Sequence, residues 1–141
     1  MFDLKNNVKI LQSISPADRI NGAVNGTAIS TQNFGSACFV LEVGTVGVAA
    51  TLAWTIEESA NGSTGWEAVP STRLIGSCAA GAANTTQIVG VNDVGGLTKS
   101  YLRPVVTVTA DTDITVGCSV VALLGNPKTV PVGVSESVYI A

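Results

Sequence analysis

The sequence contains no histidine, and only 12% of its 141 residues are charged. Soluble domains usually carry ~25% charged residues, whereas the apolar fraction here, 46%, is ordinary. A surface with so few charges is weakly protected against association. The composition therefore favours a protein that works in contact with copies of itself or with a partner.

The basic residues are also few and scattered, and the formal net charge is -3. Binding of nucleic acid requires clustered Lys and Arg, so the sequence argues against that class. The apolar stretches are interrupted well before the ~18 residues that a membrane-spanning helix needs, so we expect no membrane association. Asp3 and Lys5 interrupt the region where a signal peptide would be apolar, and we expect no secretion signal.

The three cysteines, Cys38, Cys78 and Cys118, form no CxxC pair, and without histidine they match no zinc motif. We expect free thiols in a reducing cytoplasm. The sequence also lacks a histidine base, a GxSxG motif and a Walker lysine. We therefore predict a protein that is not an enzyme, with no metal, no cofactor and no small-molecule substrate.

Strand patterns cover most of the chain, and only residues 15–20 (SPADRI) predict a short helical turn, from a Ser N-cap followed by Pro. Asn-Gly pairs at 21, 25 and 61 and the ADTD sequence at 110–113 indicate turns. Many short strands with frequent turns predict an all-β fold, a single β-sandwich or jelly-roll-like domain. Strands are expected at 36–43, 51–58, 101–110 and 114–124, with shorter candidates at 8–14, 27–30, 66–69, 72–76 and 86–91.

The alternation within these strands predicts which side chains form the core. Trp54 shares its face of 51–58 with two other large apolar side chains, and Cys118 lies on the apolar face of 114–124. Both are expected in the core.

Two strands have further features in their sequence. Residues 36–43 are mostly apolar on both faces, so this strand is expected to be covered on both sides. Pro104 cannot donate to a ladder, so 101–110 is expected at a sheet edge or with a bulge.

The two ends of the chain are too apolar for free linkers and too irregular for a core. They predict an N-terminal arm at 1–20 and a C-terminal arm at 126–141, on either side of a sandwich domain at 21–125. Such arms either pack on neighbouring subunits or fold back over their own sandwich. If they pack on neighbours, the side chains expected at the interface are Phe2, Leu4, Lys5, Val130, Val132, Tyr139 and Ile140.

The stretch EESANGSTGWEAVP at 57–70 contains the only adjacent carboxylates, Glu57 and Glu58, and glycosidases use two. Consecutive strand residues point to opposite faces, so this pair does not converge on one bond and is expected to be solvated at an edge. Trp66 follows the turn and is either a core residue or an exposed aromatic. In the second case the alternative function is a carbohydrate-binding or adhesion module on a virion tail or surface.

Six segments, in this order, carry a family resemblance: LKNNVKILQSI, VNGTAISTQNF, FVLEVGT, IEESANGSTGWEAV, YLRPVVTVT and VVALLGNPK. Together they resemble small β-rich proteins encoded among the head genes of tailed phages and prophages, thought to be capsid decoration or cement proteins. The most specific piece is the hairpin, in which Asn61 and Gly62 stand where the family often has Asp and Gly.

The resemblance implies a non-enzymatic virion structural protein on the capsid surface, made in the host cytoplasm. Its implied partners are the major capsid protein, whose subunit contacts it would reinforce, and further copies of itself in a homo-oligomer.

Overall fold

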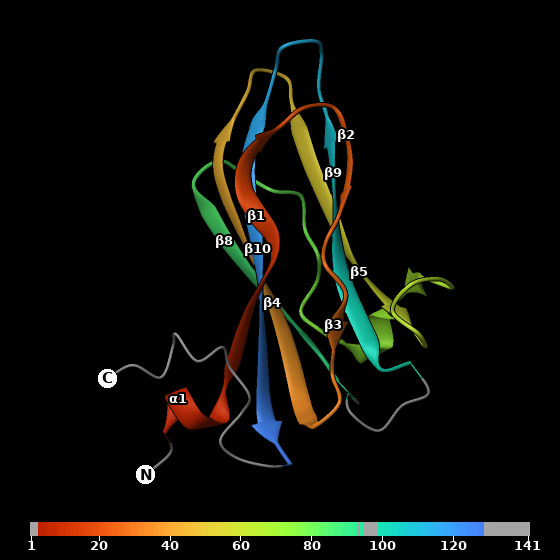
Figure 1. Cartoon of the computed structure of the whole chain (residues 1–141). Helices are drawn as coiled ribbons and strands as arrows, with labels where there is room; N and C mark the ends of the chain where they lie inside the picture. The colour runs from red at the N-terminus through yellow and green to blue at the C-terminus, as the bar shows by residue number, and fades with distance from the viewer. Residues whose placement is uncertain (1–2, 93, 95–98, 129–141) are drawn as a thin grey trace.

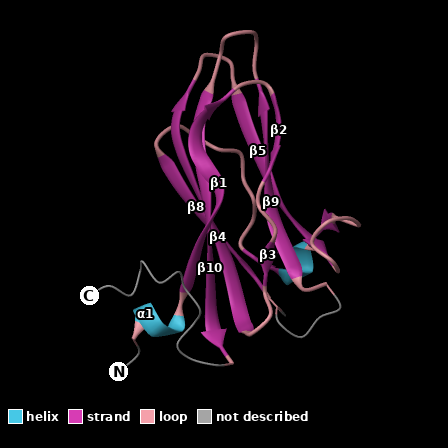
Figure 2. Ribbon diagram, viewed as in Figure 1, coloured by secondary structure: helices cyan, strands magenta, loops and turns pink. Residues whose placement is uncertain are grey.

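The computed structural model describes residues 3–92, 94 and 99–128, and it shows an all-β sandwich of two antiparallel sheets (Figures 1 and 2). Sheet A has the strand order β1-β10-β4-β8-β7, and sheet B has the order β2-β9-β5-β6, with β3 also paired to β9. The β-sandwich that the strand patterns predict is confirmed. The elements are α1 (Leu4–Asn7), β1 (Lys9–Arg19), β2 (Gly22–Asn25), β3 (Ile29–Ser30), β4 (Phe34–Val46), β5 (Thr51–Ser59), β6 (Glu67–Ala68), η1 (Ser71–Arg73), β7 (Leu74–Ile75), β8 (Thr85–Val91), β9 (Tyr101–Thr109) and β10 (Val116–Pro127).

The core lies between the two sheets, and alternate residues of the long strands point into it. Trp54 of β5 is 2% exposed and Cys118 of β10 is 5% exposed, on the inward faces that the alternation indicates. Burying a large apolar side chain contributes roughly 1.5–3 kcal/mol, so this interior is the main source of stability. The largest fully buried side chains are Phe39, Leu41, Leu52, Ile56, Leu102, Leu124, Val89, Val91, Val106, Val108, Val116 and Val120.

A hydrogen bond links the two sheets through the core. The indole N–H of Trp54 donates to Oε1 of Gln87 on β8, at 3.0 Å. Gln87 also accepts from the backbone N–H of Ala79 and donates to the carbonyl of Ala80. A Cβ at Gly81 would lie 2.9 Å from Cδ2 of Leu52, so the absence of a side chain at Gly81 lets the loop approach β5 without displacing this leucine. The small-residue loop before β8 is thereby held against β5.

The structure corrects the expected N-terminus. Lys9–Arg19 is a strand that pairs with β10 along its length, so the helical turn predicted at 15–20 is wrong. Pro16 fits because the register shifts between Ile14 and Ala17, where the bulge requires no ladder hydrogen bond from its nitrogen. From Lys9 onward the expected arm of 1–20 is therefore a strand of the sandwich. Of the expected arm at 126–141, residues 129–141 lie outside the described residues.

The structure also corrects the expected position of β9. This strand is interior in sheet B, with β5 on one side and β2 and β3 on the other, so the edge prediction is wrong. On that second side Pro104 lies between the end of β2 at Asn25 and the start of β3 at Ile29. Gly26 donates its backbone N–H to the Pro104 carbonyl, at 2.7 Å. The missing proline N–H therefore falls in a gap between two short partner strands.

Candidate functional site

The outer face of sheet A carries two cross-strand rows of mostly apolar side chains, here called the apolar rows. The strand register places neighbouring residues of each row opposite one another on adjacent strands. The first row is Ile10, Leu123, Cys38, Gly90 and Ile75, and the second is Gln12, Val121, Val40 and Ile88.

Three isoleucines of the apolar rows are unusually exposed. Ile10 on β1 is 64% exposed, Ile88 on β8 is 66% exposed and Ile75 on β7 is 58% exposed. The outer face of an antiparallel sandwich is normally polar, whereas these rows contain no charged side chain. Gly90 contributes to the packing, because a Cβ there would lie 3.3 Å from Cβ of Ile75. The rows therefore form a continuous neutral surface across the whole width of the sheet.

The same outer face continues into an open hollow of about 430 Å³. Two glycines on adjacent strands, Gly44 and Gly117, leave space there that side chains would otherwise fill. Glu42 at its rim accepts a hydrogen bond from the Thr86 hydroxyl, at 2.9 Å. No aromatic side chain is among its lining residues, so it offers no stacking platform for a sugar. These residues are Pro16, Ala17, Asp18, Glu42, Val43, Gly44, Gly117, Cys118 and Ser119.

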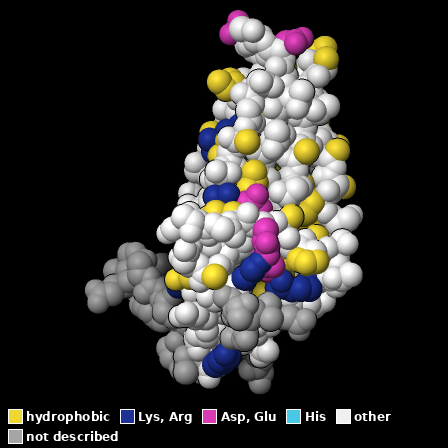
Figure 3. Space-filling model, turned by 90° about the vertical axis from the view of Figure 1, so that its right-hand side faces the viewer, with side chains coloured by type: hydrophobic (Ala, Val, Ile, Leu, Met, Phe, Trp, Pro, Cys, Tyr) yellow, Lys and Arg dark blue, Asp and Glu magenta, His cyan; other side chains and the backbone are white. Residues whose placement is uncertain are grey.

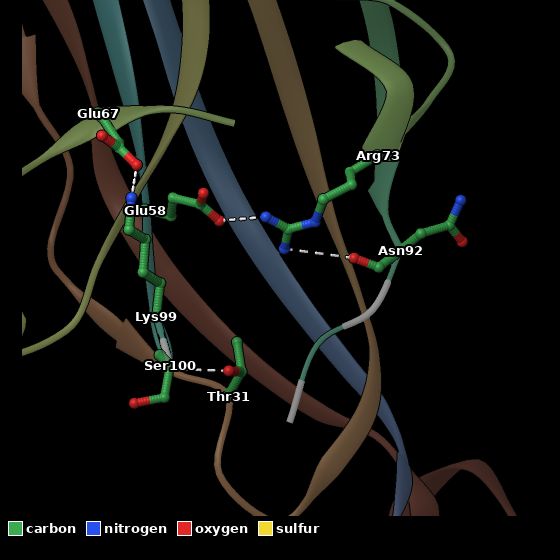
Figure 4. A network of polar contacts seen from close by, with 7 residues as sticks. All are labelled: Thr31, Glu58, Glu67, Arg73, Asn92, Lys99 and Ser100. Carbon is green, nitrogen blue, oxygen red and sulfur yellow. Dashed lines mark hydrogen bonds and ion pairs between the residues drawn. The ribbon is translucent and has the colours of Figure 1, made fainter. Parts of the chain in front are cut away.

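The two adjacent glutamates enter separate ion pairs. Glu57 accepts from Arg103 on β9, with a distance of 2.7 Å between Oε2 and the terminal guanidinium nitrogen. Glu58 points the other way and accepts from Arg73 at 2.5 Å, within the network drawn in Figure 4. The prediction that the pair does not converge is confirmed. The prediction of solvated edge residues is wrong for Glu58, which is 4% exposed because Arg73 compensates its charge inside the fold.

The hairpin after β5 is organised by side-chain hydrogen bonds at its turn. Asn61 accepts the backbone N–H groups of Ser63 and Thr64 on its Oδ1, and Gly62 has a positive φ of 76°. Ser59 is fully buried and donates to the Thr64 carbonyl. The turn predicted from the Asn-Gly pair is confirmed.

Trp66 lies just beyond this turn and is half-buried. The Arg103 guanidinium stands over its ring, 4.3 Å from the centroid. One face of the indole is thus already occupied by a cation, which weakens the carbohydrate-binding alternative. Viewed from the side of β5 and β9, acidic and basic side chains occur from the top of the molecule to its lower half, and hydrophobic ones are scattered among them (Figure 3). This side therefore differs in character from the apolar rows.

The three cysteines are free thiols with different surroundings. Burial raises the pKa of Cys38, Cys78 and Cys118, and for Cys118 the nearby Arg19 partly opposes this effect. Thiols with a raised pKa are weak nucleophiles at neutral pH. Cys38 lies in the middle of the first apolar row, where it can report on whether that row is covered.

The interface residues expected in the arms are only partly within the described chain. Leu4 in α1 is 66% exposed and Lys5 beside it is exposed. Sequence reasoning missed Ile10, Ile75 and Ile88, although the apolar second face of 36–43 is a signal for the same surface. Phe2, Val130, Val132, Tyr139 and Ile140 lie outside the described residues.

Within residues 3–92, 94 and 99–128, no group of three or more His, Cys, Asp and Glu side chains is placed to hold a metal ion. Among the helices in this part of the chain, none has the length and apolar character needed to cross a membrane.

No protein-family model matches the chain, and no curated protein matches it. Among solved structures, one similar chain belongs to the structure of infectious bursal disease virus, Gx strain, with 12% identity and a TM-score of 0.44 over 84% of this chain. Another belongs to the structure of the Gt strain of that virus, with 11% identity and a TM-score of 0.41 over 88% of this chain. The chain spans about a third of the length of these two, 32% and 34%.

Proposed function

We propose that the chain is a non-enzymatic virion structural protein that decorates and reinforces a phage capsid through protein–protein contacts. The observation that carries this proposal is the neutral outer face of sheet A, on which Ile10, Ile75 and Ile88 remain more than half exposed. Contiguous exposed apolar surface on a soluble domain marks an interaction site. The low charge of the whole chain supports the same function, because few surface charges oppose lasting contact with other proteins.

We assign the contact with the major capsid protein to the end of the sandwich where α1 lies. Helix α1 contacts β10, and it lies near the C-terminal end of that strand at the lower end of the molecule in Figure 1. Lys128, just after β10, donates its backbone N–H to the Asn33 carbonyl at 2.7 Å, so the last described residue also lies at this end. Exposed Leu4 adds apolar area there. Stable interfaces bury about 1,200 Å² or more in total, and terminal segments help to reach that area.

The test is binding of the purified protein to capsids that lack it. Full-length protein should co-sediment with such capsids and raise their melting temperature. Removing residues 1–7 together with 129–141 should weaken binding while leaving the sandwich folded, because β1 begins only at Lys9. Two results would contradict the proposal: no co-sedimentation of the full-length protein, or its absence from virions made from the genome that encodes it.

A further inference from the structure

We propose that the apolar rows of sheet A bind the same rows of a second copy of this chain, forming a face-to-face homodimer. This dimer names a partner for the surface described above. It rests on the proposed function in one respect, that the surface binds protein. The dimer itself forms without any capsid, so it can be tested separately.

The chemistry of the rows favours a neutral, apolar partner. A partner with an acidic or basic patch would have to desolvate those charges against isoleucine and valine side chains, which is unfavourable. The same face on a second copy has this chemistry, with three isoleucines more than half exposed. A two-fold interface uses one patch on both subunits and therefore needs a self-complementary surface, which a neutral apolar face provides.

The charge distribution favours contact through the rows. Each copy has a net charge of -3, so two copies repel one another weakly. The nearest acid on β4, Glu42, lies outside the rows and is hydrogen-bonded to Thr86. Two copies that approach through the rows keep these carboxylates at the margin of the contact, where water still screens them.

The size of the face suits a weak, reversible dimer. The five strands of sheet A, about 4.8 Å apart, span about 19 Å from the first to the last. Outward side chains from Ser36 to Glu42 on β4 span about 20 Å at ~3.4 Å per residue. The plan area, polar margin included, is thus at most about 400 Å² per copy, which corresponds to a small interface of the weak, reversible class. Two such sheets would pack about 10 Å apart, as sheets do inside a sandwich.

The experiment measures the mass of the purified full-length protein by sedimentation across concentrations from micromolar to millimolar. We expect a reversible shift from 14.3 kDa to twice that mass. Ile88→Lys and Ile10→Lys should each raise the dissociation constant at least tenfold. The matched control is Val48→Lys, which replaces an 87% exposed side chain in the turn after β4, away from the rows. Ile88→Thr keeps the β-branched shape of the strand and should weaken the dimer in the same direction.

Alkylation of Cys38 provides a second readout. Its rate should fall as the wild-type protein is concentrated, and it should stay constant in Ile88→Lys. Cys78, in the loop before β8, should react at a rate that does not depend on concentration. A wild-type protein that stays monomeric at millimolar concentration overturns the inference, as does an oligomer unaffected by both row variants. A monomer that still binds capsids would leave the proposed function standing, whereas a dimer that binds none would overturn that function alone.

Discussion

Glu58→Gln is expected to destabilise the sandwich by about 2–3 kcal/mol, because it leaves the Arg73 guanidinium without its carboxylate. Glu58 is 4% exposed as a residue, the Arg73 side chain is 20% exposed, and the two charged groups approach to 2.5 Å. Nε of Arg73 is buried and makes no hydrogen bond within the described residues, and its second terminal nitrogen only reaches the Asn92 carbonyl at 3.5 Å. Glu58 is therefore the main group that compensates this cation.

The expected cost of Glu58→Gln follows from the free energies known for exposed and for buried ion pairs. Exposed ion pairs contribute about 0–1 kcal/mol, whereas removing one partner of a fully buried pair costs about 3–5 kcal/mol. Arg73 lies between these limits, because part of its side chain reaches solvent and can turn toward it after the substitution. The expected cost therefore falls below the range for fully buried pairs and clearly above the range for exposed ones.

The assay is urea unfolding of Glu58→Gln, Arg73→Met and the double variant. The coupling energy of this cycle should be about 1–2 kcal/mol in favour of the native pair. Glu57→Gln is the matched control, since Glu57 is 23% exposed and its partner Arg103 keeps its contact with Trp66. We expect a smaller cost for this control, about 1 kcal/mol, because the Glu57 side chain is 23% exposed against 6% for Glu58. If Glu58→Gln costs no more than Glu57→Gln, the buried pair has no special role in stability.

Three further perturbations test the packing of the sandwich. Gly26→Ala should cost about 1–3 kcal/mol in urea unfolding, because the new Cβ would lie 2.6 Å from Cδ of Pro104. Gly44→Ala is the control and should hardly change the free energy of unfolding, because the nearest atom to its Cβ would lie at 3.7 Å. Equal costs for the two variants would contradict a steric clash at Gly26. Trp54→Phe should destabilise the sandwich by about 1–3 kcal/mol and so lower its thermal midpoint, because it leaves a small cavity and removes the hydrogen bond to Gln87. An unchanged midpoint would show that this hydrogen bond between the sheets does not stabilise the fold. Burial raises the pKa of Cys118 above its ordinary 9.0, so as the pH rises the thiol ionises in the unfolded state before it does so in the folded state. The protonated Cys118 thiol therefore contributes stability below pH 9 that is lost as the pH rises further. The unfolding free energy should then fall less steeply above pH 9 in Cys118→Ala than in the wild type, and equal slopes would count against a buried thiol.

Local alternation was sufficient to predict β4, β5, β9 and β10 and their inward faces. In β5 and β10, apolar side chains recur at every second position, and Trp54 and Cys118 lie on the buried faces. The turn at Asn61 was also predictable, since its hydrogen bonds are made within a few residues. Features that depend on period-two alternation or on local turn chemistry are thus readable from the sequence.

Features that depend on distant partners were not predictable in this way. Ser15 and Pro16 form a good local helix start, yet pairing of β1 with β10, about a hundred residues later, overrides it through a bulge. The burial of Glu58 requires Arg73, which a short 3-10 turn presents fifteen residues further along. The gap beside Pro104 exists only because two separate short strands share one side of β9.

The apolar second face of 36–43 connects the sequence with the proposed dimer. This pattern predicts a strand covered on both sides, and in the structure its second face includes Cys38 and Val40, which lie in the apolar rows. Both are only half-buried there, and β10 repeats the pattern with Val121 and Leu123. A second copy packed on this face would bury the outward side chains of both strands together, because the register places them next to one another. Loss of the dimer in Ile88→Lys would therefore test the interpretation of the sequence as well as the surface, since both require that these rows be buried against protein.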